Sequence, residues 1–246
     1  MNKKVLAWLR FFRVVNLPTV PGDIIAGAAA VLCFSEVELD ERDFFAALLA
    51  SVFLYLFGLA DNDIVGAATD TDRPIPEGWI SMLEAKLTRA SLLILALFFC
   101  LLAKSSLALF VAVALSICIT SYNRSKRPLI MGLCRGLNVV LGAMAVCQPN
   151  AIDLVVVVIA ALILTAYITA VTKYSEGEEH DPARKRKVGR LVGGLVWLQL
   201  AIILALAALH RICGFHSSFI GIVTLQFIMI TFLFLFKRLM PKVSAS

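Results

Sequence analysis

The chain has 246 residues, of which 60% are hydrophobic and only 16% are charged, and its mean hydropathy is +0.89. This balance excludes an ordinary water-soluble domain and indicates a protein embedded in a lipid bilayer. The net charge of +6 does not indicate nucleic-acid binding, because the basic residues are divided among the loops between apolar runs.

Eight apolar runs indicate membrane-spanning helices, each of which takes about 20 residues. They cover residues 14–34, 44–60, 82–103, 105–122, 128–147, 154–172, 188–209 and 217–236. We therefore predict an all-α integral membrane bundle of about eight transmembrane helices, formed as a single domain over residues 1–246. Residues 1–17 are expected to form an interfacial amphipathic lead-in, and residues 237–246 a cytoplasmic tail.

The first run contains Pro18, Pro21 and a carboxylate, Asp23. A charged side chain is costly inside a bilayer and usually faces an interior cavity. We expect Asp23 to line such a cavity, while a local cap of a kinked helix accounts for the same pattern.

The second run ends at GLADNDIVGAATDTDRPIPEG, residues 58–78, which contains four aspartates: Asp61, Asp63, Asp70 and Asp72. Crowded carboxylates repel one another unless a cation neutralises them, and Mg²⁺ prefers oxygen ligands of this kind. The segment is therefore either a metal-assisted phosphate site at a membrane face or a solvated acidic loop.

Spacing leaves two arrangements open for this segment. In a continuous helix Asp63 and Asp70 share a face, but their Cα atoms lie about 10 Å apart, too far to chelate one ion easily. Gly66 weakens such a helix by roughly 1 kcal/mol relative to alanine. Local unwinding is equally compatible with the sequence, and it would let Asp70 and Asp72 meet at one metal.

Further polar residues follow or interrupt the later runs. Arg73, Tyr122 and Lys126 lie in loops that can hold a phosphate, although positive flanks are also ordinary for membrane helices. Arg135 and Asn138 are three residues apart in the fifth run, so they share a helix face and one polar cavity satisfies both.

The distribution of Lys and Arg predicts the orientation in the membrane, because cytoplasmic loops collect positive charge. Of the 23 basic residues, nineteen fall on the side of the amino end, three on the opposite side (Arg42, Lys104 and Arg211), and Arg135 lies inside a run. We therefore expect both termini and the aspartate loops to be cytoplasmic.

The segment after the second run resembles the first aspartate-rich motif of the UbiA superfamily of intramembrane prenyltransferases, roughly N-D-x-x-D-x-x-x-D followed by R-P-I-P-x-G. Asn62 and Asp63 match its start, Gly66 stands at the middle aspartate, and Asp70 and residues 73–78 match the rest.

Other segments carry the same resemblance. Glu176-Gly177-Glu178 is similar to the second motif, D-x-E-G-D, with Tyr174 at the leading aspartate. Residues 16–27 resemble the first helix, residues 122–127 the Y-x-x-x-K-R stretch, and MGLCRGLNVVLG, residues 131–142, a short EboC-like subgroup. The superfamily generally has nine spans, one more than predicted here.

The resemblance implies Mg²⁺-dependent transfer of an isoprenoid group from a prenyl diphosphate to an aromatic or lipophilic acceptor within the membrane. The implied catalytic residues are Asn62, Asp63 and Asp70. The implied metal ligands are Asp63, Asp70, Asp72, Glu176 and Glu178. The implied substrate-binding residues are Arg73, Tyr122, Lys126, Arg135, Asn138 and Asp23.

Two other classes of protein remain open. A non-catalytic lipid or isoprenoid binding or transport protein with a degenerate site is consistent with Gly66 in the first motif. A purely structural membrane subunit is disfavoured, because Asp23, Arg135 and Asn138 would be costly within spans without a function.

Overall fold

The computed structural model describes residues 3–35, 39–103, 105–146, 149–177, 181–213 and 218–239, and these are helical apart from their connections. The elements are α1 (Lys3–Phe11), the 3₁₀-helix η1 (Val14–Thr19), α2 (Pro21–Leu32), α3 (Glu41–Val65), the 3₁₀-helix η2 (Gly66–Ala68), α4 (Met82–Leu102), α5 (Ser106–Ser125), α6 (Pro128–Val146), α7 (Ala151–Ser175), α8 (Pro182–Cys213) and α9 (Ser218–Leu239).

The predicted all-α membrane bundle is confirmed. Within the described residues, seven stretches are long and apolar enough to cross a membrane, and α9 contains a shorter apolar stretch, Ile222–Leu235. The first of the seven runs from Lys3 to Leu32 through α1, η1 and α2. Pro18 lies inside η1 and Pro21 opens α2, so the two prolines of the first run lie where it is divided into a 3₁₀-helix and an α-helix.

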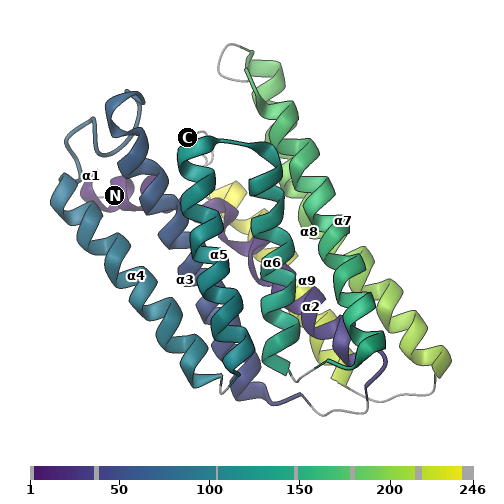
Figure 1. Ribbon diagram of the computed structural model, residues 1–246. Coiled ribbons are helices and arrows are strands. Elements are labelled where there is room, and N and C mark those ends of the chain that lie inside the picture. The colour runs from purple at the N-terminus through teal and green to yellow at the C-terminus, as the bar shows by residue number, and fades with distance from the viewer. Residues whose placement is uncertain are drawn as a thin grey trace.

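Consecutive helices from α3 to α8 run in alternating directions. In Figure 1, α3, α5 and α7 end at the upper end of the bundle, and α4, α6 and α8 begin there. The aspartate segment after α3 and the turn between α5 and α6 therefore lie at the same end of the molecule. This upper end holds the candidate site.

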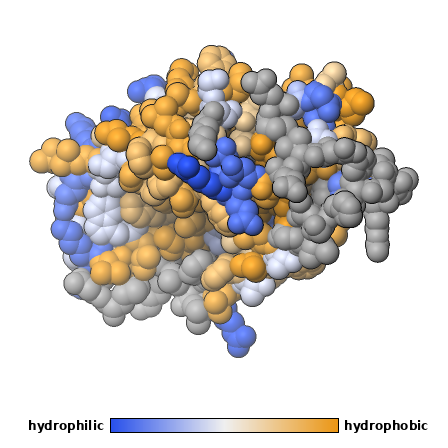
Figure 2. Space-filling model, turned by 90° about the horizontal axis from the view of Figure 1, so that it is seen from below, coloured by the Kyte–Doolittle hydropathy of each residue, from blue (hydrophilic) through white to orange (hydrophobic). Residues whose placement is uncertain are grey.

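The outer faces of the bundle carry large apolar side chains. Ile94 and Leu101 of α4 and Phe110 of α5 are each more than 60% exposed. Figure 2, which looks at the bundle from below, shows hydrophobic residues around much of its outline. Such faces would be unfavourable in water, but they suit contact with acyl chains.

Helix α2 lies at the centre of the bundle, and each of its residues is buried. It packs against α6, α7, α8, α9 and α3. Its small residues permit a close crossing with α6: a Cβ atom at Gly27 would overlap the Val139 carbonyl oxygen, and one at Gly142 would overlap that of Ile24. Small side chains at a crossing are the usual way for membrane helices to approach closely.

The close crossing of α2 and α6 leads to a prediction about stability. Gly142→Ala should lower the free energy of unfolding by about 1–3 kcal/mol, because the added methyl forces α2 and α6 apart. Gly189→Ala in α8 is the matched control, since a Cβ there meets only open space, and alanine should stabilise that helix by about 1 kcal/mol. Thermal unfolding of both variants in detergent measures the difference. Equal unfolding midpoints would contradict the close crossing.

Candidate active site

A cavity of about 280 Å³ lies between α3, α5 and α6, with residues of the η1 and aspartate segments at its edge. Four charged residues line it, and all four are basic: Arg13, Arg73, Lys126 and Arg135. The walls between them are largely apolar, formed by Val20, Leu54, Leu59, Leu115, Ile119 and Met131. A cavity with these walls and charges suits an amphiphilic anion.

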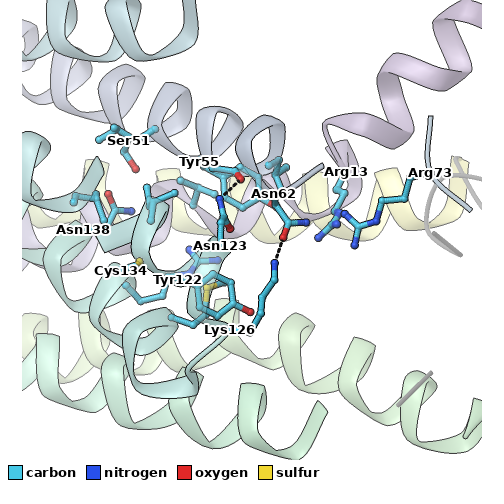
Figure 3. Close-up of a pocket in the computed structure, with 18 residues that line it drawn as sticks. Arg13, Ser51, Tyr55, Asn62, Arg73, Tyr122, Asn123, Lys126, Cys134 and Asn138 are labelled. Carbon is cyan, nitrogen blue, oxygen red and sulfur yellow. Dashed lines mark hydrogen bonds between the residues drawn. The ribbon is translucent and has the colours of Figure 1, made fainter. Parts of the chain in front are cut away.

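The cavity has a cationic outer end and a deeper inner end. Figure 3 shows Arg13, Arg73 and Lys126 around Asn62, whereas Ser51 and Asn138 lie at the far side of the cavity. Asn62 and Ser51 both belong to α3 and are eleven residues apart. At 1.5 Å per residue the cavity therefore follows about 16 Å of this helix.

Two of the cations at the outer end have an unusual backbone. Arg13 has φ 40° and Lys126 has φ 54°, and they are the two non-glycine residues with positive φ in the part of the chain that the structure describes. The left-handed conformation costs a residue with a side chain about 1–2 kcal/mol. Strain of this kind persists where the surrounding structure holds it, often at functional sites.

Helix α1 holds Arg13 in place. The Phe11 side chain is fully buried, and the guanidinium of Arg10 lies 3.0 Å from a Glu77 carboxylate oxygen. The Lys4 ammonium lies 2.8 Å from Glu84 at the start of α4. The amphipathic lead-in is thus packed onto the aspartate segment and α4, and this contact positions the first basic residue of the cavity.

Lys126 is the C-cap residue of α5, and its ammonium donates to the Asn62 side-chain oxygen. Burial lowers the pKa of Lys126 from the ordinary 10.5, and the nearby charge of Arg73 lowers this pKa further. Its ammonium also lies 5.6 Å from the centre of the Tyr122 ring. The lowered pKa means that the charge of Lys126 is only partly compensated, so an anion in the cavity would stabilise it.

Two aspartates of the first motif converge on one guanidinium. Arg73 binds Asp63 through Nη1 and lies 2.9 Å from Asp70 through Nε. Asp63 is 2% exposed, and an Arg13 nitrogen lies 3.6 Å from the same carboxylate oxygen. The two carboxylates therefore lie beside Arg73, which lines the cavity, although neither aspartate lines it.

Local unwinding at Gly66 produces this convergence. Helix α3 ends at Val65, and η2 turns the chain so that a Cβ on Gly66 would overlap the Asp70 carboxylate. Of the two arrangements that the sequence left open, the structure has the unwound one. It brings Asp70 to Asp63, whereas the Asp72 side chain is exposed and its carbonyl oxygen accepts from Arg10 at 3.0 Å.

The second acidic segment lies at the same end of the bundle but apart from the cavity. Glu176 is exposed after α7, and its carbonyl oxygen accepts from Arg184 at 2.9 Å. Figure 1 shows α7 projecting beyond the turn between α5 and α6. Glu178 lies outside the described residues. Within those residues, no three His, Cys, Asp or Glu side chains form a group that could hold a metal.

Asp61 has a separate environment. It is 1% exposed, and its two oxygens accept from Arg89 at 3.0 Å and from Asn123 at 2.9 Å. The Asn123 amide also donates to the Gly58 carbonyl oxygen at 3.0 Å. Asp61 therefore joins α3 to α4 and α5.

The buried polar residues of the first and fifth runs form one network. Asp23 is fully buried and accepts from Arg135 at 2.8 Å, from Asn138 at 3.1 Å and from Gln199 at 2.6 Å. Arg135 also donates to the hydroxyl of Thr19 at 3.1 Å. Arg135 and Asn138 line the cavity, whereas Asp23 lies behind them and holds them.

Sequence reasoning did not identify Arg13, Ser51, Asn123 or Gln199. Arg13 was assigned to the membrane-surface segment, because a basic residue among aromatics fits an interfacial helix equally well. Ser51 and Gln199 are single polar residues in apolar runs, and that exception to the apolar pattern is a usable signal. Asn123 follows Tyr122 in the Y-x-x-x-K-R stretch.

Together, the fold and the cavity define an integral membrane protein with an internal cavity that has a basic end and apolar walls. The family model described as "UbiA prenyltransferase family" matches residues 24–244. The chain belongs to this family. A search of curated proteins finds no match.

Solved structures share the fold. A structure from work on digeranylgeranylglyceryl phosphate synthase is 22% identical with a TM-score of 0.58, over 99% of this chain and 93% of that one. A UbiA homologue from Archaeoglobus fulgidus bound to DMAPP and Mg²⁺ is 16% identical with a TM-score of 0.55. The match covers 96% of this chain and 87% of that one. An apo UbiA homologue from Aeropyrum pernix K1 is 16% identical with a TM-score of 0.58. The match covers 92% of this chain and 95% of that one.

The backbone of Lys126 provides a test of strain at the site. Lys126→Gly and Lys126→Ala both remove the ammonium, but only glycine adopts the left-handed conformation at no steric cost. The glycine variant should therefore be more stable than the alanine variant by about 1 kcal/mol. Thermal unfolding in detergent compares the two. An alanine variant at least as stable as the glycine variant would show that residue 126 stores no strain.

Proposed function

We propose that this chain transfers an isoprenoid group from a prenyl diphosphate to a lipophilic acceptor within the membrane. The observation that carries the proposal is the convergence of Arg13, Arg73 and Lys126 with Asp63 and Asp70 at the outer end of an apolar-walled cavity. A diphosphate needs this cationic end, and an isoprenoid chain needs the apolar walls. Family membership and the neighbour that binds DMAPP and Mg²⁺ support the same reaction class.

The charge balance at the outer end favours an anion. Three cations face two carboxylates there, which leaves one net positive charge in a partly buried place. Arginine binds phosphate oxygens through paired hydrogen bonds, and lysine acts as a point charge. Arg13, Arg73 and Lys126 would bind the diphosphate, with Tyr122 and Asn62 beside it.

The donor set suits Mg²⁺. Proteins commonly bind this ion through one or two carboxylates, with water and substrate phosphate completing the shell. Asp63 and Asp70 already converge on one cationic group, Arg73, so they would hold the ion together with the Asn62 amide oxygen. When bound, the ion would neutralise the leaving diphosphate. Asp72, Glu176 and Glu178 remain candidates for further ligands.

The apolar walls would exclude water from the reacting carbon. When the allylic C–O bond ionises, the diphosphate takes the bonding electrons and the carbon becomes a cation that water would capture. Leu59, Ile119 and Met131 are among the apolar residues that line the cavity. They would keep the cation available to the acceptor.

A non-catalytic isoprenoid binder is the second candidate, and Gly66 favours it. A glycine at the middle position of the first motif removes one carboxylate. The Asp70 carboxylate lies beside that position, and this arrangement supports the enzyme. If the protein binds a prenyl diphosphate but does not turn it over, the non-catalytic binder is correct and the enzyme is not.

Turnover can be tested with the purified chain in lipid nanodiscs, radiolabelled geranyl diphosphate, Mg²⁺ and a membrane lipid extract as the source of acceptor. The native chain should release diphosphate and form a labelled lipid. Asp63→Ala and Asp70→Ala should each lower the rate by about 100-fold or more, because each removes charge that stabilises the leaving group.

Thr71→Ala is the matched control, since it changes an exposed side chain of the same segment and should leave the rate near the native value. Chelation of Mg²⁺ should abolish product in the native chain. Turnover that survives both aspartate substitutions would exclude this site.

We further propose that the outer end of the cavity faces the cytoplasm, on the basis of the nineteen basic residues assigned to that side. Thr71→Cys should react with a membrane-impermeant maleimide only after cells are permeabilised. Ala151→Cys, at the start of α7 on the opposite end, should react in intact cells. The native chain supplies the background from its own cysteines, and the reverse pattern would invert the orientation.

A further inference from the structure

The inner end of the cavity contains two buried oxygen atoms without a hydrogen-bond partner among the described residues. They are the hydroxyl of Ser51, in a residue that is 1% exposed, and the side-chain oxygen of Asn138, in a residue that is 5% exposed. Both residues line the cavity, and Figure 3 shows them on neighbouring walls of its inner end. Buried polar atoms are seldom left unpaired in a folded protein, so this pair points to a ligand.

The bonding of Asn138 determines which kind of ligand group fits. Its amide nitrogen donates to Asp23 at 3.1 Å, so the remaining oxygen only accepts. The Ser51 hydroxyl can accept or donate. A ligand group that satisfies both must therefore offer an O–H or N–H donor.

The charge at this end selects a neutral group. Arg135 is the charged residue that lines it, and its guanidinium lies 2.8 Å from the fully buried Asp23 carboxylate. The pair has no net charge. A carboxylate placed here would lose its hydration without gaining an unpaired cation, which is strongly unfavourable.

The position of this end also excludes the diphosphate. The outer cations surround Asn62, about 16 Å along α3 from Ser51. A diphosphate bound by those cations leaves the inner end to another part of the substrate pair. A purely hydrocarbon chain end would bury both oxygens without a partner.

We propose that the inner end of the cavity is the acceptor subsite, and that it takes a compact neutral acceptor whose hydroxyl or N–H group donates to Asn138 and Ser51. The acceptor's reacting atom then faces the outer end, where the prenyl carbon lies. This assignment rests on the proposed function, because it identifies which substrate occupies the end that the diphosphate does not reach.

Binding of three probes that share the naphthalene ring tests the subsite: 1-naphthol, 1-methylnaphthalene, which matches 1-naphthol in size, and 1-naphthoate, which carries a charge. The chain is held in lipid nanodiscs, and partition into empty nanodiscs is subtracted. Ser51→Ala should weaken binding of 1-naphthol by about three- to tenfold, the effect of one neutral hydrogen bond, and leave 1-methylnaphthalene unchanged. The native chain should bind 1-naphthol more tightly than 1-naphthoate.

Ser116→Ala is the matched control, because it removes a hydroxyl of α5 that lies outside the cavity lining. Asn138→Ala is a second variant and should produce the same selective loss. If Ser51→Ala weakens both neutral probes equally, or neither, or if 1-naphthoate binds as tightly as 1-naphthol, the proposed subsite is wrong.

These measurements need neither Mg²⁺ nor a prenyl diphosphate, so they separate the subsite from the reaction. Asp63→Ala should bind 1-naphthol as the native chain does. Selective binding of 1-naphthol by a chain without turnover would refute the proposed reaction alone. Turnover without this selectivity would refute the subsite alone.

Discussion

The buried ion pair between Asp23 and Arg135 is the constraint on which the arrangement of the cavity depends. Asp23 is fully buried and Arg135 is only 9% exposed, and loss of one partner of a buried pair typically costs about 3–5 kcal/mol. The pair joins α2 to α6, and the crossing at Gly27 and Gly142 brings the two backbones close enough for it to form. The pair therefore holds α2 against α6, the helix that supplies Arg135 and Asn138 to the cavity lining.

Other interactions hold the basic residues at the outer end of the cavity in place. Arg13 and Lys126 adopt strained left-handed backbones, and the packing of α1 and the hydrogen bond to Asn62 hold them there. Their charges are balanced only in part by Asp63 and Asp70. Strain and incomplete charge compensation both raise the free energy of the site without ligand, and a bound anion would relieve the electrostatic part.

The apolar runs predicted the spans well, because a bilayer imposes length and polarity on every helix that crosses it. The second apolar run ends at residue 60, but helix α3 continues to Val65, so the run did not predict where this helix ends. Asp61 and Asp63 are buried charged residues inside that helix, and hydropathy cannot reveal that each is paired with an arginine, Asp61 with Arg89 and Asp63 with Arg73. The meeting of Asp63 with Asp70 also depends on unwinding at Gly66, which the sequence left undecided.

The two ends of the cavity impose an orientation on any amphiphile that enters. The outer end has excess positive charge, and the inner end has a neutral ion pair with oxygens that lack donors. An anionic head would be stabilised at the outer end, and a neutral hydroxyl would donate to the unpaired oxygens at the inner one. Since both ends lie along α3, one rigid helix sets the distance between them. The separation of charge along that helix would thus assign one substrate to each end before any bond is broken.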